Sequence, residues 1–96
     1  MFDLKDRVVV VSGASSGLGK QMARGFAQQG AKLVILARRM ERLEELKNEL
    51  GDVEVLPIKC DVTSTEDINN AASKAEEVFG KVDVFTNLIY KTNTNW

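Results

Sequence analysis

Three spaced glycines directly after a run of valines are the residues in this sequence best suited to binding chemistry. The run Val8–Val11 fits a strand buried on both faces, and Gly13, Gly17 and Gly19 fall in the turn before a helical pattern. Glycine permits a positive φ and lets backbone N–H groups approach an anion with no Cβ in the way. The positive end of the following helix favours negative charge. The spacing therefore predicts a pyrophosphate-binding turn.

Two other interpretations of these glycines are open. A phosphate loop of the nucleoside-triphosphatase kind needs Gly, four residues, and then Gly-Lys-Ser/Thr. Gly19-Lys20 supplies the middle of that motif, but Ala14 stands at the first glycine and Gln21 at the hydroxyl that would hold Mg²⁺. The glycines could also simply close a turn. The pattern favours the dinucleotide site over both.

Short apolar runs alternate with helical patterns along the chain, and these elements must position the glycine turn. We expect strands at Arg7–Ser12, Lys32–Ala37, Val53–Lys59 and Val82–Thr86, and helices at Leu18–Gln29, Met40–Leu50 and from a cap at Thr63 or Ser64 to Gly80. In the first helix, Leu18, Met22 and Phe26 form an apolar stripe. Pro57 suits an edge strand because proline removes a ladder donor.

This alternation is typical of right-handed βαβ crossovers on a parallel sheet. We predict an α/β fold: a Rossmann-type doubly wound parallel sheet, truncated to about four strands in the order 3-2-1-4, with three helices. Residues 1–86 would form a nucleotide-binding half-domain, and residues 87–96 a divergent tail. The first two helices should lie on one face of the sheet and the third alone on the other.

Composition excludes several function classes. The 96 residues include 13 basic and 14 acidic side chains, which gives no support for binding nucleic acid or a charged membrane surface. One cysteine excludes an internal disulfide and fits a reducing compartment, and no histidine or Cys/His/Asp cluster indicates a metal. The N-terminal apolar run of four residues is too short for a signal or membrane segment, so a cytoplasmic location is expected.

Four separated motifs resemble the short-chain dehydrogenase/reductase family. They are Ser12-Gly13-Ala-Ser-Ser-Gly17-Leu-Gly19, Ala37-Arg38-Arg39, Cys60-Asp61-Val62 and Gly80-Lys-Val-Asp-Val84, and together they span roughly residues 5–85. The resemblance implies a seven-stranded doubly wound sheet in the complete fold, of which this chain holds the N-terminal part. It also implies NAD(H) or NADP(H) as cofactor and interconversion of an alcohol and a carbonyl, as in ketoacyl-carrier-protein reductases. The cofactor-binding positions it implies are Gly13, Ser15, Ser16, Gly17, Leu18, Gly19, Arg38, Arg39, Asp61, Val62 and Asn87.

The residues after the second strand favour NADP(H) over NAD(H). An NAD site places an acid there to accept from the ribose 2′-OH, whereas Ala37 stands in that position. Arg38 and Arg39 follow, and a guanidinium offers a planar fork for a 2′-phosphate. In relatives with this pattern, Arg38 and Ser15 are the positions expected at that phosphate. Alternatively, the arginines are solvated and pair with acids of the next helix, Glu41 or Glu44.

The third strand is followed by Cys60 and Asp61. The family resemblance places Asp61 and the next backbone N–H at the adenine edge, and a turn before the third helix is a compatible second role for Asp61. Cys60 is expected to be a small buried hydrophobe rather than a reactive thiol.

The resemblance fails at the fourth strand. The family continues as Asn-Asn-Ala-Gly, where this chain has Asn87-Leu-Ile-Tyr90, so only the first asparagine survives. The family's acid/base tyrosine and the lysine four residues later are also missing, because Thr94 stands four residues after Tyr90, the single tyrosine. We therefore expect no catalytic residues and no turnover by this chain alone. The divergent ending fits either a truncation with a frame change or a natural terminus.

Two hypotheses of different classes remain: the cofactor-binding part of an oxidoreductase, and a non-catalytic module that binds nucleotide or self-associates. An unpaired edge on the fourth strand and uncovered apolar surface on Val8–Val11 and Leu33–Leu36 would favour a homo-oligomer.

Overall fold

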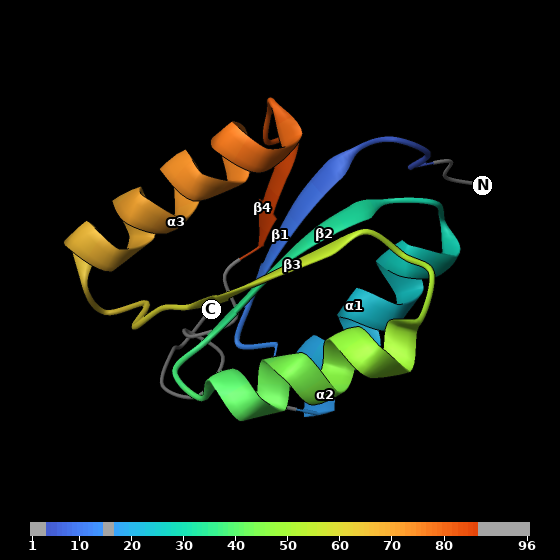
Figure 1. The fold of residues 1–96 in the computed structure, drawn as a ribbon, viewed down its shortest axis with the longest axis horizontal. Coiled ribbons are helices and arrows are strands. Elements are labelled where there is room, and N and C mark those ends of the chain that lie inside the picture. The colour runs from blue at the N-terminus through green and yellow to red at the C-terminus, as the bar shows by residue number, and fades with distance from the viewer. Residues whose placement is uncertain (1–3, 15–16, 87–96) are drawn as a thin grey trace, which may run out of the picture.

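The computed structural model describes residues 4–14 and 17–86, which form one four-stranded sheet and three helices (Figure 1). Strands and helices alternate strictly along the chain. The elements are β1 (Val8–Ser12), α1 (Gly17–Gln28), β2 (Lys32–Ala37), α2 (Met40–Leu50), β3 (Val55–Lys59), α3 (Thr65–Phe79) and β4 (Val84–Thr86).

The sheet has the order β3-β2-β1-β4, and all three pairings are parallel. Val10 of β1 lies between Val34 of β2 and Phe85 of β4. Consecutive parallel strands need crossover helices, and each of the three helices provides one. The predicted fold class and strand order are confirmed.

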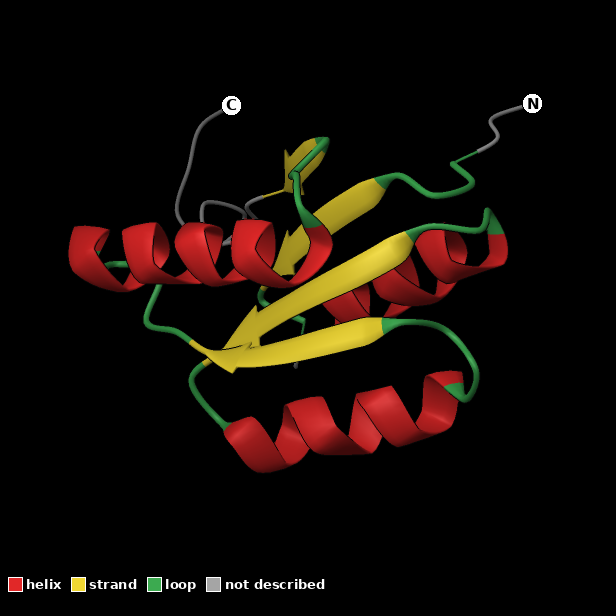
Figure 2. Ribbon diagram, turned by 45° about the horizontal axis from the view of Figure 1, so that its top comes forward, coloured by secondary structure: helices red, strands yellow, loops and turns green. Residues whose placement is uncertain are grey.

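Helices α1 and α2 lie on one face of the sheet and α3 on the other (Figure 2). Side chains alternate along a strand, so Val9 and Val11 pack toward α1 and α2, while Val8 and Val10 pack toward α3. The predicted placement of the helices is confirmed. Because both faces of β1 are covered, all five of its residues are buried.

One expectation about the sheet surface is wrong: the runs Val8–Val11 and Leu33–Leu36 are not uncovered, because none of these residues is more than 1% exposed. On the α3 face, Ala71 and Ala75 are buried, and the larger side chains of Ile68, Phe79 and Val82 pack around them against the core. One helix is therefore enough to cover both central strands. The exposed large apolar residues among those described are Val84 and Phe85 of β4, at 39% and 41%, Leu18 of α1 at 45% and Val78 of α3 at 49%.

The ends of the elements follow local hydrogen bonds. The side chain of Ser64 accepts from the N–H of Asp67 at 3.2 Å, so Ser64 rather than Thr63 caps α3. Strands β3 and β4 each begin two residues later than the sequence pattern indicates. In the first case, Val53 N–H bonds back to the Leu50 carbonyl in the turn after α2. In the second, Asp83 uses its carboxylate to accept from the N–H of Val8.

The two edges of the sheet differ in what they offer to another strand. Just outside the two ends of β3, the Glu54 carbonyl accepts from the Leu33 N–H, and the Cys60 N–H donates to the Ala37 carbonyl. Every second residue between them therefore turns its N–H and carbonyl toward β2. Pro57 is one of the residues in between, whose backbone faces away from β2. Its missing N–H removes a donor from the outer edge, which confirms the predicted edge placement of this proline. Among the described residues, β4 pairs only with β1 and has no proline.

Candidate functional site

The turn between β1 and α1 depends on one close contact. A Cβ added at Gly19 would lie 2.1 Å from the Gly13 carbonyl oxygen and 2.9 Å from the Ala14 Cα. Gly13 itself has φ +69°, in the left-handed region that favours glycine. The N–H of Ala14 donates to the Leu36 carbonyl at 3.1 Å, which fixes the turn to the end of β2. The first helical turn therefore lies directly against the chain leaving β1.

The start of α1 is open on its outer side. A Cβ added at Gly17 would meet no atom within 4 Å, and Leu18 is 45% exposed. Leu18 does not continue the expected apolar stripe to the helix start: Gly19 and Ala23 are the buried residues, and Phe26 is partly buried against the core. Ser15 and Ser16 lie outside the described residues.

The charge at the start of α1 also differs from that of the other helices. The first turn of α1 contains no acidic residue, whereas α2 has Glu41 and α3 has Glu66 and Asp67 there. An acid in the first turn offsets the positive end of the helix dipole. At α1 that compensation does not come from the helix's own first turn, so an anionic ligand would be favoured.

The end of β2 presents two exposed cations. Ala37 is buried, while Arg38 and Arg39 are exposed. Neither arginine forms an ion pair within 4.0 Å in the part of the chain that the structure describes, so the alternative pairing with Glu41 or Glu44 is not formed. Arg39 is the residue before α2 and caps it with no side-chain hydrogen bond. Both guanidinium groups thus face solvent beside the carboxyl end of the sheet.

The end of β3 is bound to the end of β2, because Cys60 N–H donates to the Ala37 carbonyl at 2.9 Å. Asp61 follows, and its Oδ1 accepts from the hydroxyl and the N–H of Thr63 at 2.6 and 2.9 Å. These two bonds lower the pKa of Asp61, and the charge of Arg38 lowers it further. Asp61 therefore has the expected turn role and carries a carboxylate near Arg38. Val62, half-buried, packs against the core on the α3 face.

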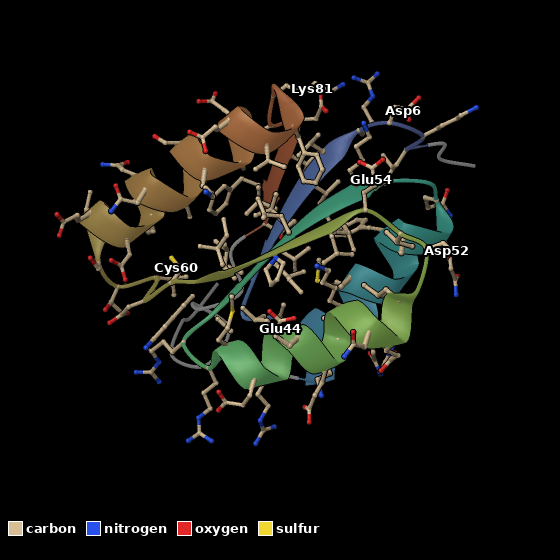
Figure 3. All side chains as sticks on the ribbon, in the orientation of Figure 1. Asp6, Glu44, Asp52, Glu54, Cys60 and Lys81 are labelled. Carbon is tan, nitrogen blue, oxygen red and sulfur yellow. The ribbon has the colours of Figure 1, made fainter. Side chains whose placement is uncertain are left out.

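The Cys60 thiol is not a nucleophile candidate. Its residue is 1% exposed, and burial, with the charges of Asp67 and Asp61, raises the thiol pKa. A raised pKa leaves less thiolate at neutral pH, and the thiolate is the reactive form. Figure 3 shows Cys60 at the end of the molecule opposite Asp6 and Glu54.

Two reciprocal hydrogen bonds join the ends of β1 and β4, and the sequence analysis missed their function. The Ser12 hydroxyl donates to the Thr86 carbonyl at 2.9 Å, and the Thr86 hydroxyl donates to the Val10 carbonyl at 3.0 Å. A hydroxyl residue at the last position of an apolar strand was the available signal. The bonds hold the carboxyl ends of β1 and β4 together. This is where the strand order changes direction, since β2 and β3 lie on one side of β1 and β4 on the other. Asn87 lies outside the described residues.

The carboxyl ends of three strands thus bring together a glycine turn, two unpaired arginines and one carboxylate. This arrangement can bind a polyanion, because its amide-rich turn and cations are held by backbone bonds. Among residues 4–14 and 17–86, no group of three or more Cys, Asp or Glu side chains could hold a metal ion. In the same residues, no helix combines the length and apolarity that a membrane crossing requires.

Comparison with known proteins gives a consistent result. Residues 7–88 match the family model described as short chain dehydrogenase. An uncharacterized oxidoreductase of Staphylococcus saprophyticus is 41% identical over 87 residues, covering 91% of this chain and 35% of that protein. A second uncharacterized oxidoreductase, from Bacillus subtilis, is 44% identical over 86 residues, covering 88% of this chain and 24% of that protein.

Solved structures agree with this result. An alcohol dehydrogenase from Thermococcus sibiricus, complexed with 5-hydroxy-NADP, superimposes with a TM-score of 0.78 at 39% identity over 82% of this chain and 35% of that one. A 3-ketoacyl-(acyl-carrier-protein) reductase from Brucella melitensis, complexed with NADH, superimposes with a TM-score of 0.81 at 37% identity. The match covers 86% of this chain and 34% of that one. The chain therefore spans about a third or less of the length of these relatives.

Proposed function

Because this chain belongs to the short chain dehydrogenase family, we propose that it is the NADP(H)-binding N-terminal part of such an oxidoreductase. This chain covers only 35% and 24% of the two relatives, so the activity of a complete protein is part of the proposal. The observation that carries it is the Gly19 contact: the helix start lies so close to the turn that only hydrogen fits. A turn this tight brings backbone amides near a pyrophosphate.

The residues of the site fit a nicotinamide dinucleotide at separate places. Gly13, Gly17, Leu18 and Gly19 would bind the pyrophosphate at the open start of α1. Asp61 and Val62 would bind the adenine edge at the end of β3. Ser15, Ser16 and Asn87 complete the proposed set. A bound nicotinamide ring would supply or accept the hydride; the chain's own residues bind and orient it.

The proposed preference for NADP(H) over NAD(H) rests on the end of β2. Ala37 carries no carboxylate to repel a 2′-phosphate, and Arg38 is exposed with no ion pair within 4.0 Å among the described residues. The charge of Arg38 also helps to lower the pKa of Asp61, which follows β3 at the same edge of the sheet. Arg39 is the second cation there. A guanidinium binds phosphate through paired, charge-assisted hydrogen bonds.

Isothermal titration with NADP⁺ and NAD⁺ tests this binding. We expect NADP⁺ to bind more tightly, and Arg38→Gln to weaken NADP⁺ by roughly tenfold or more, since a hydrogen bond to a charged group contributes about 1.5–3 kcal/mol. Arg42→Gln, a matched exposed arginine in α2, should leave both affinities unchanged. Failure of the wild-type chain to bind either nucleotide would overturn the proposal.

We further propose that the chain alone performs no hydride transfer. Its single tyrosine, Tyr90, has Thr94 four residues later, whereas the family pairs a tyrosine with a lysine at that spacing. No histidine is present to replace it as an acid or base. A carbonyl-reduction assay with NADPH should give no turnover; reproducible turnover by the pure chain would contradict this. With its one cysteine buried and free, we expect a reducing, cytoplasmic setting.

The β4 edge favours a second candidate function, self-association. Val84 and Phe85 are exposed, and β4 pairs only with β1 in the described part of the chain. Asp83 N–H donates to Val8, so the Val84 N–H, one residue on, faces away from β1. A second copy could pair there and extend the sheet across a two-fold axis.

Sedimentation at micromolar concentration tests this function. Val84→Pro should shift the chain to monomer, because it removes an outward donor and leaves the bonds to β1 in place. Val84→Thr, which keeps the N–H, should preserve association. A wild-type monomer would refute self-association.

A further inference from the structure

The last residue of β3, Lys59, lies beside the proposed phosphate site. It is the register partner of Ala37, the last residue of β2 before Arg38. The bond from Cys60 N–H to the Ala37 carbonyl holds the two strand ends at this spacing. Neighbouring strands lie only about 4.8 Å apart, and a lysine carries its ammonium on a four-carbon stem. The Lys59 ammonium can therefore reach the space next to the Arg38 guanidinium.

The face of the sheet on which Lys59 lies can be read from β3. Val55 belongs to the core on the α1 and α2 face, and Lys59, four residues later in the same strand, shares that face. Lys59 is exposed and lines a hollow of about 380 Å³ at the outer edge of β3, bordered by Met40 of α2 and by Asp67, Asn70, Ala71 and Lys74 of α3. Lys59 thus lies at the end of the β3 edge, between α3 and the start of α2, where Arg38 and Arg39 lead into that helix.

Three cations lie at these strand ends with two carboxylates nearby: Asp61 follows β3, and Asp67 lines the same hollow as Lys59. Lys59, Arg38 and Arg39 form no ion pair within 4.0 Å in the described residues. The nearby carboxylate of Asp61 already accepts two hydrogen bonds from Thr63. Lys32, Lys74 and Lys81 contact Glu54, Glu77 and Asp83, whereas Lys20 and Lys47, like Lys59, form no ion pair within 4.0 Å among the described residues. Three like charges on adjoining strand ends repel one another unless an anion lies between them.

We propose that Lys59 is a specificity-determining residue, which binds the 2′-phosphate of NADP(H) together with Arg38. The inference rests on the proposed NADP(H) function and deepens it by naming a residue outside the family motifs. A phosphate monoester carries roughly −1.5 to −2 charge at pH 7, enough to accept both cations. Lys59 acts on the phosphate alone, so it should not affect the binding of nucleotides that lack it.

The test uses two small probes, adenosine 2′,5′-bisphosphate and 5′-AMP, titrated into the intact chain beside NADP⁺ and NAD⁺. We expect Lys59→Gln to weaken the bisphosphate and NADP⁺ by roughly fivefold at low salt, and to leave 5′-AMP and NAD⁺ within about twofold. Lys59→Arg should keep most of the wild-type preference. The matched control is Lys74→Gln, because Lys74 lines the same hollow but contacts Glu77 at 3.5 Å.

The outcomes separate this inference from the proposal beneath it. If the wild type prefers NADP⁺ and Lys59→Gln keeps that preference, the role of Lys59 is wrong and the proposed function stands. If the wild type binds no nucleotide, the proposed function fails and the inference fails with it. Equal losses for 5′-AMP and the bisphosphate would also overturn it, because they indicate a general effect on the site. Melting curves of each variant confirm that it is folded.

Discussion

Replacing Gly19 with alanine should destabilise the chain, although the same change elsewhere in α1 should stabilise it. The added Cβ would lie 2.1 Å from the Gly13 carbonyl oxygen and 2.8 Å from its carbon, both backbone atoms. Real Cβ contacts below 3.0 Å essentially do not occur, so the helix start must move away from the turn by about an ångström. Overpacking of this kind costs about 1–3 kcal/mol.

Part of that cost is offset, because alanine has a higher helix propensity than glycine by up to about 1 kcal/mol. The net loss should be about 1–2 kcal/mol, which lowers the melting temperature of a domain this size by roughly 5–15 °C. Gly25 provides the matched control: it lies in the middle of α1, and an added Cβ would meet no atom within 4 Å. Gly25→Ala should raise the melting temperature by roughly 2–8 °C.

Thermal unfolding followed by far-ultraviolet circular dichroism measures both variants under one condition. The prediction is the opposite sign of the two shifts, since helix propensity alone would raise both. A Gly19→Ala chain at least as stable as the wild type would refute the close packing between the helix start and the Gly13 turn. The proposed pyrophosphate site would then lose its main structural support.

Three further predictions use single substitutions. Ser64→Ala should cost about 0.5–2 kcal/mol in urea unfolding because α3 loses its side-chain cap, whereas Ser64→Asp should keep most of that stability. Asp83→Asn should lower the melting temperature at pH 7: the bond from Val8 N–H and the contacts with Lys81 and Arg7 hold the pKa of Asp83 below its usual value. That stabilisation is present above the ordinary aspartate pKa of about 3.9 and is lost as pH falls through the lower folded-state pKa. The melting temperatures of the wild type and Asp83→Asn should therefore converge in acid. A constant difference between them down to pH 2 would contradict this prediction. Pro57→Val restores an outward N–H on β3 and should increase aggregation in light scattering with little change in unfolding free energy.

Much of the fold could be predicted because its signals are local. The uninterrupted apolar runs Val8–Val11 and Leu33–Leu36 identify strands covered on both faces, and the alternation with helices fixes a parallel sheet. Pro57 indicated an edge strand because proline has no N–H to donate, and such a residue fits a sheet where its backbone faces no neighbouring strand. The bounds of β2 and α2 were predicted to the residue.

The features that the sequence did not reveal depend on distant partners. The late start of β4 follows from the Asp83 carboxylate bonding to Val8, 75 residues earlier, which no local pattern encodes. The burial of β1 and β2 on the α3 face was missed because it depends on side chains that meet only in the fold, such as Ile68 and Phe79 of α3 and Val82 before β4. Leu18 fits a helical stripe by spacing, yet the direction of the helix start turns it to solvent.

At the candidate site, the motifs predicted which strand ends would meet, but not how their side chains are engaged. Arg38 and Arg39 form no ion pair with Glu41 or Glu44, although these residues are close in sequence. Asp61 is engaged twice, because its Oδ1 accepts from Thr63 and its N–H donates to Asp67, and the second bond depends on where α3 begins. The Ser12–Thr86 pair likewise joins strands that are 74 residues apart.

The bond between Val8 and Asp83 also bears on how this polypeptide is made. During synthesis the first strand emerges 75 residues before the carboxylate that completes it. At roughly 5–20 residues per second, the ribosome needs about 4–15 s to reach that point. Throughout this interval a stretch of four valines lacks one of its neighbours and is open to association between nascent chains. The first strand should therefore determine how strongly the nascent chain depends on chaperones, although in the folded chain it is as fully buried as Leu33–Leu36 of β2.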